Sequence, residues 1–130
     1  MKELFKVLKK LYKMDKIFQI LFFLCLGIIE FLATTTQEIS LVSSIWDKAN
    51  HFTAFFVLYI LLSLGYSTLG RWLKTAILLA FGMQIEIVQS FIDGRYFSML
   101  DVFADSIGIL LGVIAYRLLI LKNMKFFFRK

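Results

Sequence analysis

The stretch Trp46-Asp-Lys-Ala-Asn-His-Phe-Thr-Ala-Phe55 opens a long apolar segment with three ionisable side chains. A second stretch, residues 86–101, closes one apolar segment and opens the next, and it too carries charge. Ionisable residues in membrane-embedded segments are costly, and they are usually paired, turned toward the protein interior and functional. These two stretches therefore decide both the expected fold and the expected position of the site.

Composition identifies the class of protein. Hydrophobic residues make up 60% of the 130 residues, against roughly 45–50% in soluble domains. Charged residues, at 18%, are too few to cover a soluble domain of this length. Four apolar segments, at about 17–33, 47–69, 72–91 and 98–121, alternate with charged punctuation. We predict one all-α, integral membrane domain, a four-helix transmembrane bundle without a second domain.

Two charged arms flank the predicted membrane domain, which spans residues 17–121. In the N-terminal arm, 1–16, apolar residues at helical spacing share one face and lysines occupy the rest. That pattern predicts a short basic amphipathic helix on an anionic membrane surface, although the charge alone could equally act as a retention signal. A basic tail, 122–130, closes the chain.

The first apolar segment, 17–33, is at the short end of the roughly 17–25 residues that a spanning helix needs. A cleaved signal peptide is the competing interpretation, but the sequence after residue 33 lacks a small-x-small cleavage site, which favours an uncleaved anchor. Glu30 lies near its end, where it either reaches the interface or joins the site. Cys25, the only cysteine, cannot form an intramolecular disulfide and is expected to pack in the core.

The lysines and arginines predict the orientation, because cytoplasmic flanks of membrane helices are enriched in them. Thirteen of the 15 lie in the N-terminal arm, at positions 71 and 74, and in residues 117–130. Only Lys48 and Arg95 fall on the other side. We therefore predict a multi-pass protein of the cytoplasmic membrane with both termini inside. The net charge of +6 lies where this topology requires it, so nucleic-acid binding is not expected.

This orientation gathers the unusual polar residues in the outer leaflet. They form the predicted binding site: Asp47, Lys48, His51, Glu86, Gln89, Arg95, Asp101 and Asp105. Asp47 and His51 lie about 40° apart on one helix face. Asp101 and Asp105 share a stripe with Gly108 and Gly112, whose spacing allows close helix approach and, as one option, oligomerisation.

Several of these residues also have a purely structural interpretation. Asp47 could be an N-cap, and Ser98-Met-Leu-Asp101 has the form of a capping box. Glu86 lies about 7 Å inside its helix end, where a carboxylate must be protonated or paired. Its candidate partners are Arg95, His51 and Lys48, and such a pair could simply lock the helices together.

The ligand class stays open on residue types alone. Two helix N-termini together with Lys48 and Arg95 suit a phosphate. The excess of carboxylates opposes an anion unless one is protonated or a hard divalent cation binds. A zinc site is not predicted, since His51 has no second histidine or cysteine beside it to complete a usual set. The sequence assigns no metal and leaves any cofactor unknown.

These motifs resemble the VanZ-like family of small membrane proteins, named for an accessory protein that protects against teicoplanin. The family pattern is Asp-Lys-x-x-His-Phe-x-x-Phe, then Glu-x-x-Gln-x-Phe, an Arg, and Asp-x-x-x-Asn-x-x-Gly-x-x-x-Gly. The matching positions are Asp47, Lys48, His51, Phe52, Phe55, Glu86, Gln89, Phe91, Arg95, Ser98, Asp101, Gly108 and Gly112. Asp105 departs from the pattern, because it stands where the family usually has Asn.

The resemblance implies a role at the outer face of the cytoplasmic membrane, in contact with cell-envelope precursors or linked to glycopeptide susceptibility. Our leading hypothesis is recognition of a lipid headgroup or envelope intermediate. The second is an intramembrane enzyme, with Glu86 or Asp101 as general base and His51 as acid on a phosphorylated or lipid-linked substrate. The third is a structural or scaffold protein. A proton-coupled carrier is less favoured, because four spans leave little room for a pathway.

Overall fold

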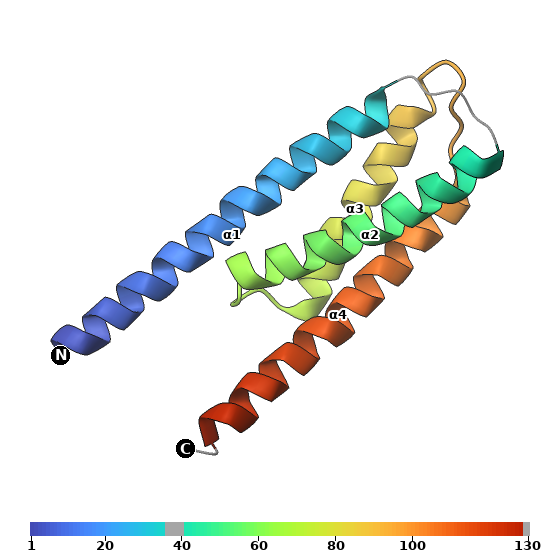
Figure 1. Cartoon of the computed structure of the whole chain (residues 1–130). Coiled ribbons are helices and arrows are strands. Elements are labelled where there is room, and N and C mark those ends of the chain that lie inside the picture. The colour runs from blue at the N-terminus through green and yellow to red at the C-terminus, as the bar shows by residue number, and fades with distance from the viewer. Residues whose placement is uncertain (36–40, 129–130) are drawn as a thin grey trace.

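The fold is a set of four antiparallel helices. The computed structural model describes residues 1–35 and 41–128; for some of these, including 41–47, it describes the backbone alone. The helices are α1 (Lys2–Thr34), α2 (Leu41–Gly65), α3 (Arg71–Gln89) and α4 (Met99–Phe128). The chain runs up and down, so that both termini lie at one end of the molecule (Figure 1). The predicted all-α class is confirmed.

The N-terminal arm is not a separate short helix, as predicted, but the first part of α1. The chain contains no proline, and no glycine precedes Gly27, so nothing breaks the helix between arm and first span. α1 has 33 residues, about 50 Å at 1.5 Å per residue, against a hydrocarbon core of about 30 Å. The N-terminal part of the helix therefore extends well past the ends of α2 and α3, as the C-terminal part of α4 also does (Figure 1).

The other helix boundaries differ modestly from those predicted. α2 begins at Leu41, several residues before the predicted start near 47, so the polar connection expected over 34–45 is partly helical and otherwise lies outside the described residues. α4 continues to Phe128, beyond the predicted end at 121. The predicted turn at Asp93-Gly94 is present, and Gly94 has a φ of 82°, a conformation that favours glycine.

Within the described residues, three helical stretches are long and apolar enough to cross a membrane: Lys13–Thr34, Lys48–Gly65 and Met99–Asn123. α3 is not among them. Its 19 residues cover about 28 Å, but Lys74, Glu86 and Gln89 lower its hydropathy. All three of these side chains are buried, so they face the other helices rather than the surroundings. The predicted fourth span is therefore not confirmed by composition.

α2 occupies the centre of the structure and packs against each of the other helices. The buried core consists of Phe22, Phe55, Leu58, Tyr59, Leu62, Leu78, Ile85 and Ile109. Gln19 of α1 adds a polar tie, since its side-chain amide donates a 2.8 Å hydrogen bond to the Gly65 carbonyl at the end of α2. Most apolar residues on the outer surfaces of α1 and α4 remain exposed, as expected for helices that face lipid.

The closest helix contact joins α2 and α4 at the predicted pair of glycines. A Cβ added at Gly108 would overlap the backbone carbonyl of Phe52, and one added at Gly112 would lie 2.8 Å from the Tyr59 Cβ. Both glycines are buried within a single chain. Because they already serve the α2–α4 contact, the structure gives no support to oligomerisation through them.

We expect Gly108→Ala to destabilise the protein by about 1–3 kcal/mol, the usual cost of overpacking, because the obstructing group is backbone. Gly27→Ala is the matched control: it lies in the interior of α1, and a Cβ there meets nothing within 4 Å. Thermal unfolding in detergent, read as a ranking, should place Gly108→Ala clearly below the wild type and Gly27→Ala at or above it. Equal behaviour of the two variants would contradict the close α2–α4 approach.

Candidate functional site

Three helices supply a cluster of ionisable side chains at the end of the molecule opposite both termini (Figure 1). Lys48 and His51 come from the first half of α2, Glu86 from the end of α3, and Asp101 and Asp105 from the start of α4. Since consecutive helices alternate in direction, positions far apart in sequence meet at this end. We call these five residues the polar cluster.

The shortest contact in the polar cluster joins α2 to α4. His51 Nδ1 lies 2.9 Å from Asp105 Oδ1, and Asp105 is completely buried. When Asp105 is ionised its carboxylate can only accept a hydrogen bond, and Nδ1 of His51 is then the donor. This bond fixes the orientation of the imidazole ring and turns its Nε2 toward Glu86 and Asp101, at 3.9 and 4.0 Å.

Glu86 is completely buried and joins α3 to the start of α4. Its Oε2 accepts a 3.0 Å hydrogen bond from the backbone N–H of Ser98, which precedes the first residue of α4. Ser98 Oγ in turn accepts from the Asp101 N–H at 3.3 Å. The predicted capping box is therefore only half formed. Ser98 Oγ accepts from the Asp101 N–H as predicted, but the Ser98 N–H donates to Glu86 and not to the Asp101 side chain.

The Asp101 side chain does not cap α4 and instead faces Lys48 and His51. Its Oδ1 lies 3.7 Å from Lys48 Nζ and its Oδ2 lies 4.0 Å from His51 Nε2. The Asp101 side chain is 9% exposed and that of Lys48 is 36% exposed, so Lys48 lies at the accessible edge of the cluster. Glu86 Oε1, Asp101 Oδ1 and Asp105 Oδ2 are buried oxygens without a hydrogen-bond donor.

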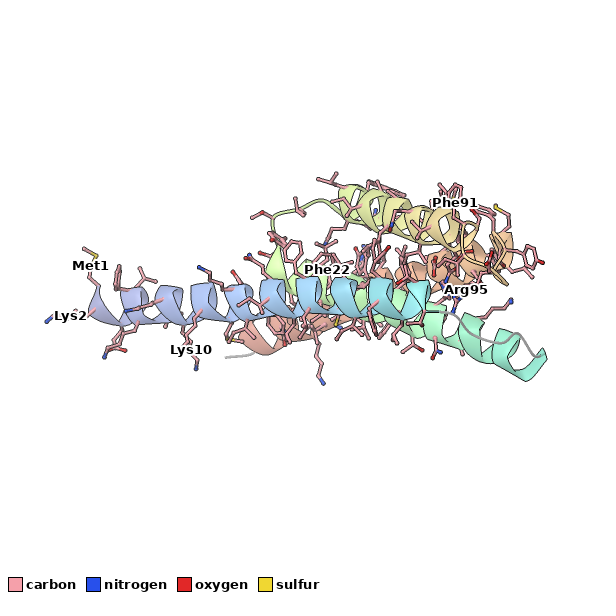
Figure 2. All side chains as sticks on the ribbon, turned by 90° about the horizontal axis from the view of Figure 1, so that it is seen from above. Met1, Lys2, Lys10, Phe22, Phe91 and Arg95 are labelled. Carbon is pink, nitrogen blue, oxygen red and sulfur yellow. The ribbon has the colours of Figure 1, made fainter. Side chains whose placement is uncertain are left out.

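The remaining predicted residues lie outside this arrangement. Arg95 is half-buried in the α3–α4 turn, at the end of the molecule far from Met1 and Lys2 (Figure 2), and among the described residues its side chain forms no ion pair with Glu86. Of the three candidate partners for Glu86, His51 is the one within 4 Å. Gln89 instead binds α1, donating to the Ala33 carbonyl at 3.1 Å.

Two further sequence interpretations concern residues away from the polar cluster. Glu30 pairs with Gln84, whose side-chain amide donates to Glu30 Oε1 at 3.0 Å, so Glu30 does not join the cluster. The side chain of Asp47 is outside the described part of the structure, and its N-cap role is not seen because α2 begins six residues earlier, at Leu41.

Sequence reasoning missed the residue that makes room for Asp105. A Cβ at Gly82 would lie 2.6 Å from Asp105 Oδ2, so only glycine lets α3 approach this carboxylate. It also treated Lys74 as a surface charge, whereas Lys74 is 3% exposed and donates a 2.9 Å hydrogen bond to Ser63 Oγ. The position of Lys74, one turn inside an apolar helix, was the signal in the sequence that could have indicated its burial.

Long apolar helices, exposed apolar flanks and a charged cluster buried between helices define a membrane protein. A family model described as VanZ/LLP1 matches residues 1–121. The chain belongs to this family, as the sequence motifs indicated. No curated protein and no solved structure matches the chain in the corresponding searches.

We expect Asp105→Ala to lower stability by about 1–3 kcal/mol, the cost of leaving a buried donor unsatisfied, because His51 Nδ1 would lose its acceptor. Asp105→Asn is the matched variant, since its amide oxygen can still accept that bond while a buried charge is removed. Thermal unfolding in detergent should rank Asp105→Ala lowest and Asp105→Asn near the wild type. If both variants fall equally, the carboxylate charge matters more than the hydrogen bond.

Proposed function

We propose that this VanZ-family protein recognises the phosphate-bearing headgroup of a lipid-linked cell-envelope precursor at the outer face of the cytoplasmic membrane. The observation that carries the proposal is a buried, charged cluster whose accessible edge is a lysine. Packing alone does not require charge here, because buried ion pairs are often no more stabilising than apolar residues of similar size. The arrangement therefore suggests a ligand.

The accessible cations supply the specificity in this proposal. Lys48 is partly exposed next to buried Asp101, and Arg95 is half-buried in the neighbouring turn. A phosphate contacting both would gain charge-assisted hydrogen bonds, while its lipid chain lies against the apolar outer surfaces of the helices. Glu86, Asp101 and Asp105 would hold Lys48 and His51 in place beneath it.

The charge distribution supports this orientation. Both termini lie at one end of the molecule (Figure 1). In the sequence, 13 of the 15 lysines and arginines lie in the N-terminal arm, at positions 71 and 74, and in residues 117–130. The basic end of a membrane protein faces the cytoplasm. In the proposed topology the polar cluster is therefore in the outer leaflet, α3 is a fourth, internally packed span, and binding of wall precursors would connect the protein to glycopeptide (teicoplanin) susceptibility.

An intramembrane acid–base enzyme is the second candidate, and the His51–Asp105 bond is the observation that favours it. A carboxylate that orients one imidazole nitrogen leaves the other available for proton transfer. In this version Glu86 or Asp101 acts as base, His51 as acid, and Lys48 with Arg95 stabilises the charge that develops on phosphate. The substrate would be a phosphorylated lipid-linked molecule.

The test is a thermal shift with two matched probes, polyprenyl phosphate and the corresponding polyprenol without phosphate. A bound ligand raises the apparent stability by an amount that grows with its concentration over Kd, so only the phosphate form should raise Tm. Lys48→Gln should remove most of that shift. Lys9→Gln, an exposed lysine of α1 far from the site, is the control and should keep it.

Inorganic phosphate is measured in the same samples. Its release by the wild type and not by Glu86→Gln would select the enzyme, whereas a Tm shift without release selects recognition. Equal shifts from both probes, or an unchanged shift in Lys48→Gln, would reject headgroup recognition at this site. Copurification of a stoichiometric partner protein together with no ligand response would favour the scaffold hypothesis.

A further inference from the structure

We propose that His51, Glu86 and Asp101 bind a divalent transition-metal ion of the Zn²⁺ or Mn²⁺ kind. One ligand atom from each residue, the imidazole Nε2 or a carboxylate oxygen, lies within 4.8 Å of the other two. Glu86 is completely buried, and its Oε1 faces this space without a hydrogen-bond donor. The inference concerns the polar cluster but does not depend on headgroup recognition.

Three electron-pair donors, the imidazole Nε2 of His51 and one carboxylate oxygen each of Glu86 and Asp101, face one another at the centre of the cluster. In the neutral tautomer that donates through Nδ1 to Asp105, Nε2 of His51 carries a lone pair, and this lone pair is directed at Glu86 and Asp101. Without a cation between them these groups repel each other. A second proton on Nε2 would reduce this repulsion through ion pairs with Glu86 and Asp101, but it would form no direct hydrogen bond, since 3.9 and 4.0 Å exceed the 2.7–3.2 Å of an N–H···O bond.

The space matches a metal ion in size. An ion equidistant from His51 Nε2 and Glu86 Oε1 would lie at least half of 3.9 Å, about 2 Å, from both atoms. Bonds of Zn²⁺ to imidazole nitrogen and carboxylate oxygen are roughly 2.0–2.2 Å. The 4.0 Å from Nε2 to Asp101 Oδ2 gives nearly the same value. The cluster is therefore wide enough for an ion and too wide for direct hydrogen bonds.

Charge and supporting contacts agree with this assignment. Among the described side chains of the cluster, three carboxylates face one lysine; with all three ionised and His51 neutral, the net charge is −2, which a divalent cation balances. Asp105 bonds the nitrogen of His51 that is not directed at the site, the arrangement that orients histidine ligands in metalloproteins. Three protein ligands leave a coordination position open, which a phosphate oxygen could occupy.

Binding of Mn²⁺ alone by the full chain tests the site. Purified protein in detergent is stripped with EDTA, and free Mn²⁺ is followed by electron paramagnetic resonance. We expect one equivalent to bind, with a nitrogen coupling from His51 and displacement by Zn²⁺. Glu86→Gln and Asp101→Asn should each weaken binding more than about tenfold, because even supporting partners contribute about 10–100-fold. Asp93→Asn, an exposed acidic residue in the α3–α4 turn, should bind normally.

Two results would overturn the assignment: Mn²⁺ and Zn²⁺ affinities that are equal in wild type and in folded Asp101→Asn, or bound Mn²⁺ without nitrogen coupling. The metal test and the headgroup test can fail separately, because the first uses metal without lipid. A protein that binds Mn²⁺ but gives no polyprenyl phosphate shift would keep the metal site and lose the proposed function.

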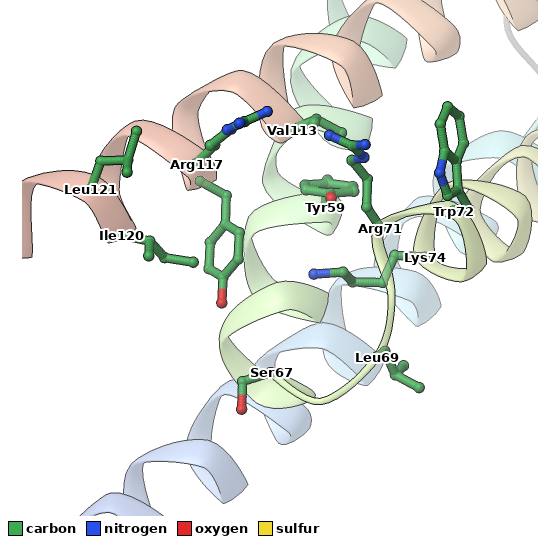
Figure 3. A pocket seen from close by; sticks show the side chains of 11 residues that line it. Tyr59, Ser67, Leu69, Arg71, Trp72, Lys74, Val113, Arg117, Ile120 and Leu121 are labelled. Carbon is green, nitrogen blue, oxygen red and sulfur yellow. The ribbon is translucent and has the colours of Figure 1, made fainter. Parts of the chain in front are cut away.

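A different observation carries a second proposal, at the other end of the bundle. We infer that a cavity of about 480 Å³ between α2, α3 and α4 binds a phosphate group, that of an anionic phospholipid in the leaflet facing both termini. Its lining includes Arg71, Lys74 and Arg117, whose side chains lie around the ring of Tyr59 (Figure 3). Among the described residues, no acidic side chain lines it.

Lys74 is the decisive residue, because its ammonium group is buried without a counter-charge. It is 3% exposed and donates to Ser63 Oγ at 2.9 Å. Its Nζ lies 5.2 and 4.7 Å from the ring centroids of Tyr59 and Tyr116. Among the described residues no carboxylate lies within ion-pair distance of it. A buried charge is costly unless paired, and a bound phosphate would supply the missing partner.

The remainder of the lining suits a lipid better than a soluble ion. Val113, Ile120 and Leu121 provide an apolar wall that continues along the exposed flank of α4. Basic pockets between membrane helices at the cytoplasmic side are suited to the headgroups of anionic lipids. Trp72 at the rim is 77% exposed and stacks below the Arg71 guanidinium at 5.2 Å, so it reports on occupancy.

Fluorescence quenching measures this binding directly. Trp46→Phe leaves Trp72 as the only tryptophan, and the protein is reconstituted with brominated phosphatidylglycerol or brominated phosphatidylcholine. We expect phosphatidylglycerol to quench preferentially. Lys74→Met and Arg117→Gln should each reduce this preference about fivefold, the contribution of one basic residue to anionic-lipid attraction. Lys122→Gln, an exposed lysine outside the lining of the cavity, is the matched control.

An equal effect of Lys122→Gln and Arg117→Gln, or no preference in the wild type, would overturn the pocket and indicate diffuse surface attraction. Should Lys74→Met fail to fold, Arg117→Gln still decides. Added glycerol phosphate distinguishes the source of the phosphate: if it abolishes the preference, the pocket also accepts soluble phosphates, and if it has no effect, the pocket requires the lipid.

Discussion

Burial of three carboxylates between helices is the constraint on which the rest of this structure depends. Each must find a partner, bind a cation or take up a proton, since an isolated charge in a low-dielectric interior is strongly unfavourable. Asp105 meets His51, Asp101 meets Lys48, and Glu86 meets the first backbone N–H before α4. These contacts fix α2, α3 and α4 relative to one another at one end, and glycines at 82 and 108 allow the close approach that they require.

The two ends of the bundle carry buried excess charge of opposite sign. At one end carboxylates are in excess, and at the other Lys74 is buried with Arg71 and Arg117 nearby. Neither excess is neutralised by the described side chains themselves. Ligands of opposite sign would complete each end, a cation between His51 and Glu86 and a phosphate beside Lys74.

Much of this structure could be predicted from the sequence, because its signals are local. The lengths of the apolar segments predicted the helices. The alternating direction of consecutive helices predicted that residues 48, 51, 86, 101 and 105 lie at the same end. Which atoms pair with one another could not be predicted. The Ser98 N–H was expected to donate to the Asp101 side chain, but it donates to Glu86, twelve residues before Ser98. The burial of Lys74 and the role of Gly82 depend on the rotation of each helix about its axis, which hydropathy does not determine in helices that are apolar on most of their surface.

The half-formed capping box has a mechanical consequence. Glu86 belongs at once to the end of α3, to the start of α4 and to the polar cluster, so the α3–α4 turn has no independent freedom. A rotation of α3 that moved Glu86 would release Ser98, loosen the first turn of α4 and displace Asp101 with it. The conformation of the α3–α4 turn and the position of Asp101 are therefore linked through the single side chain of Glu86.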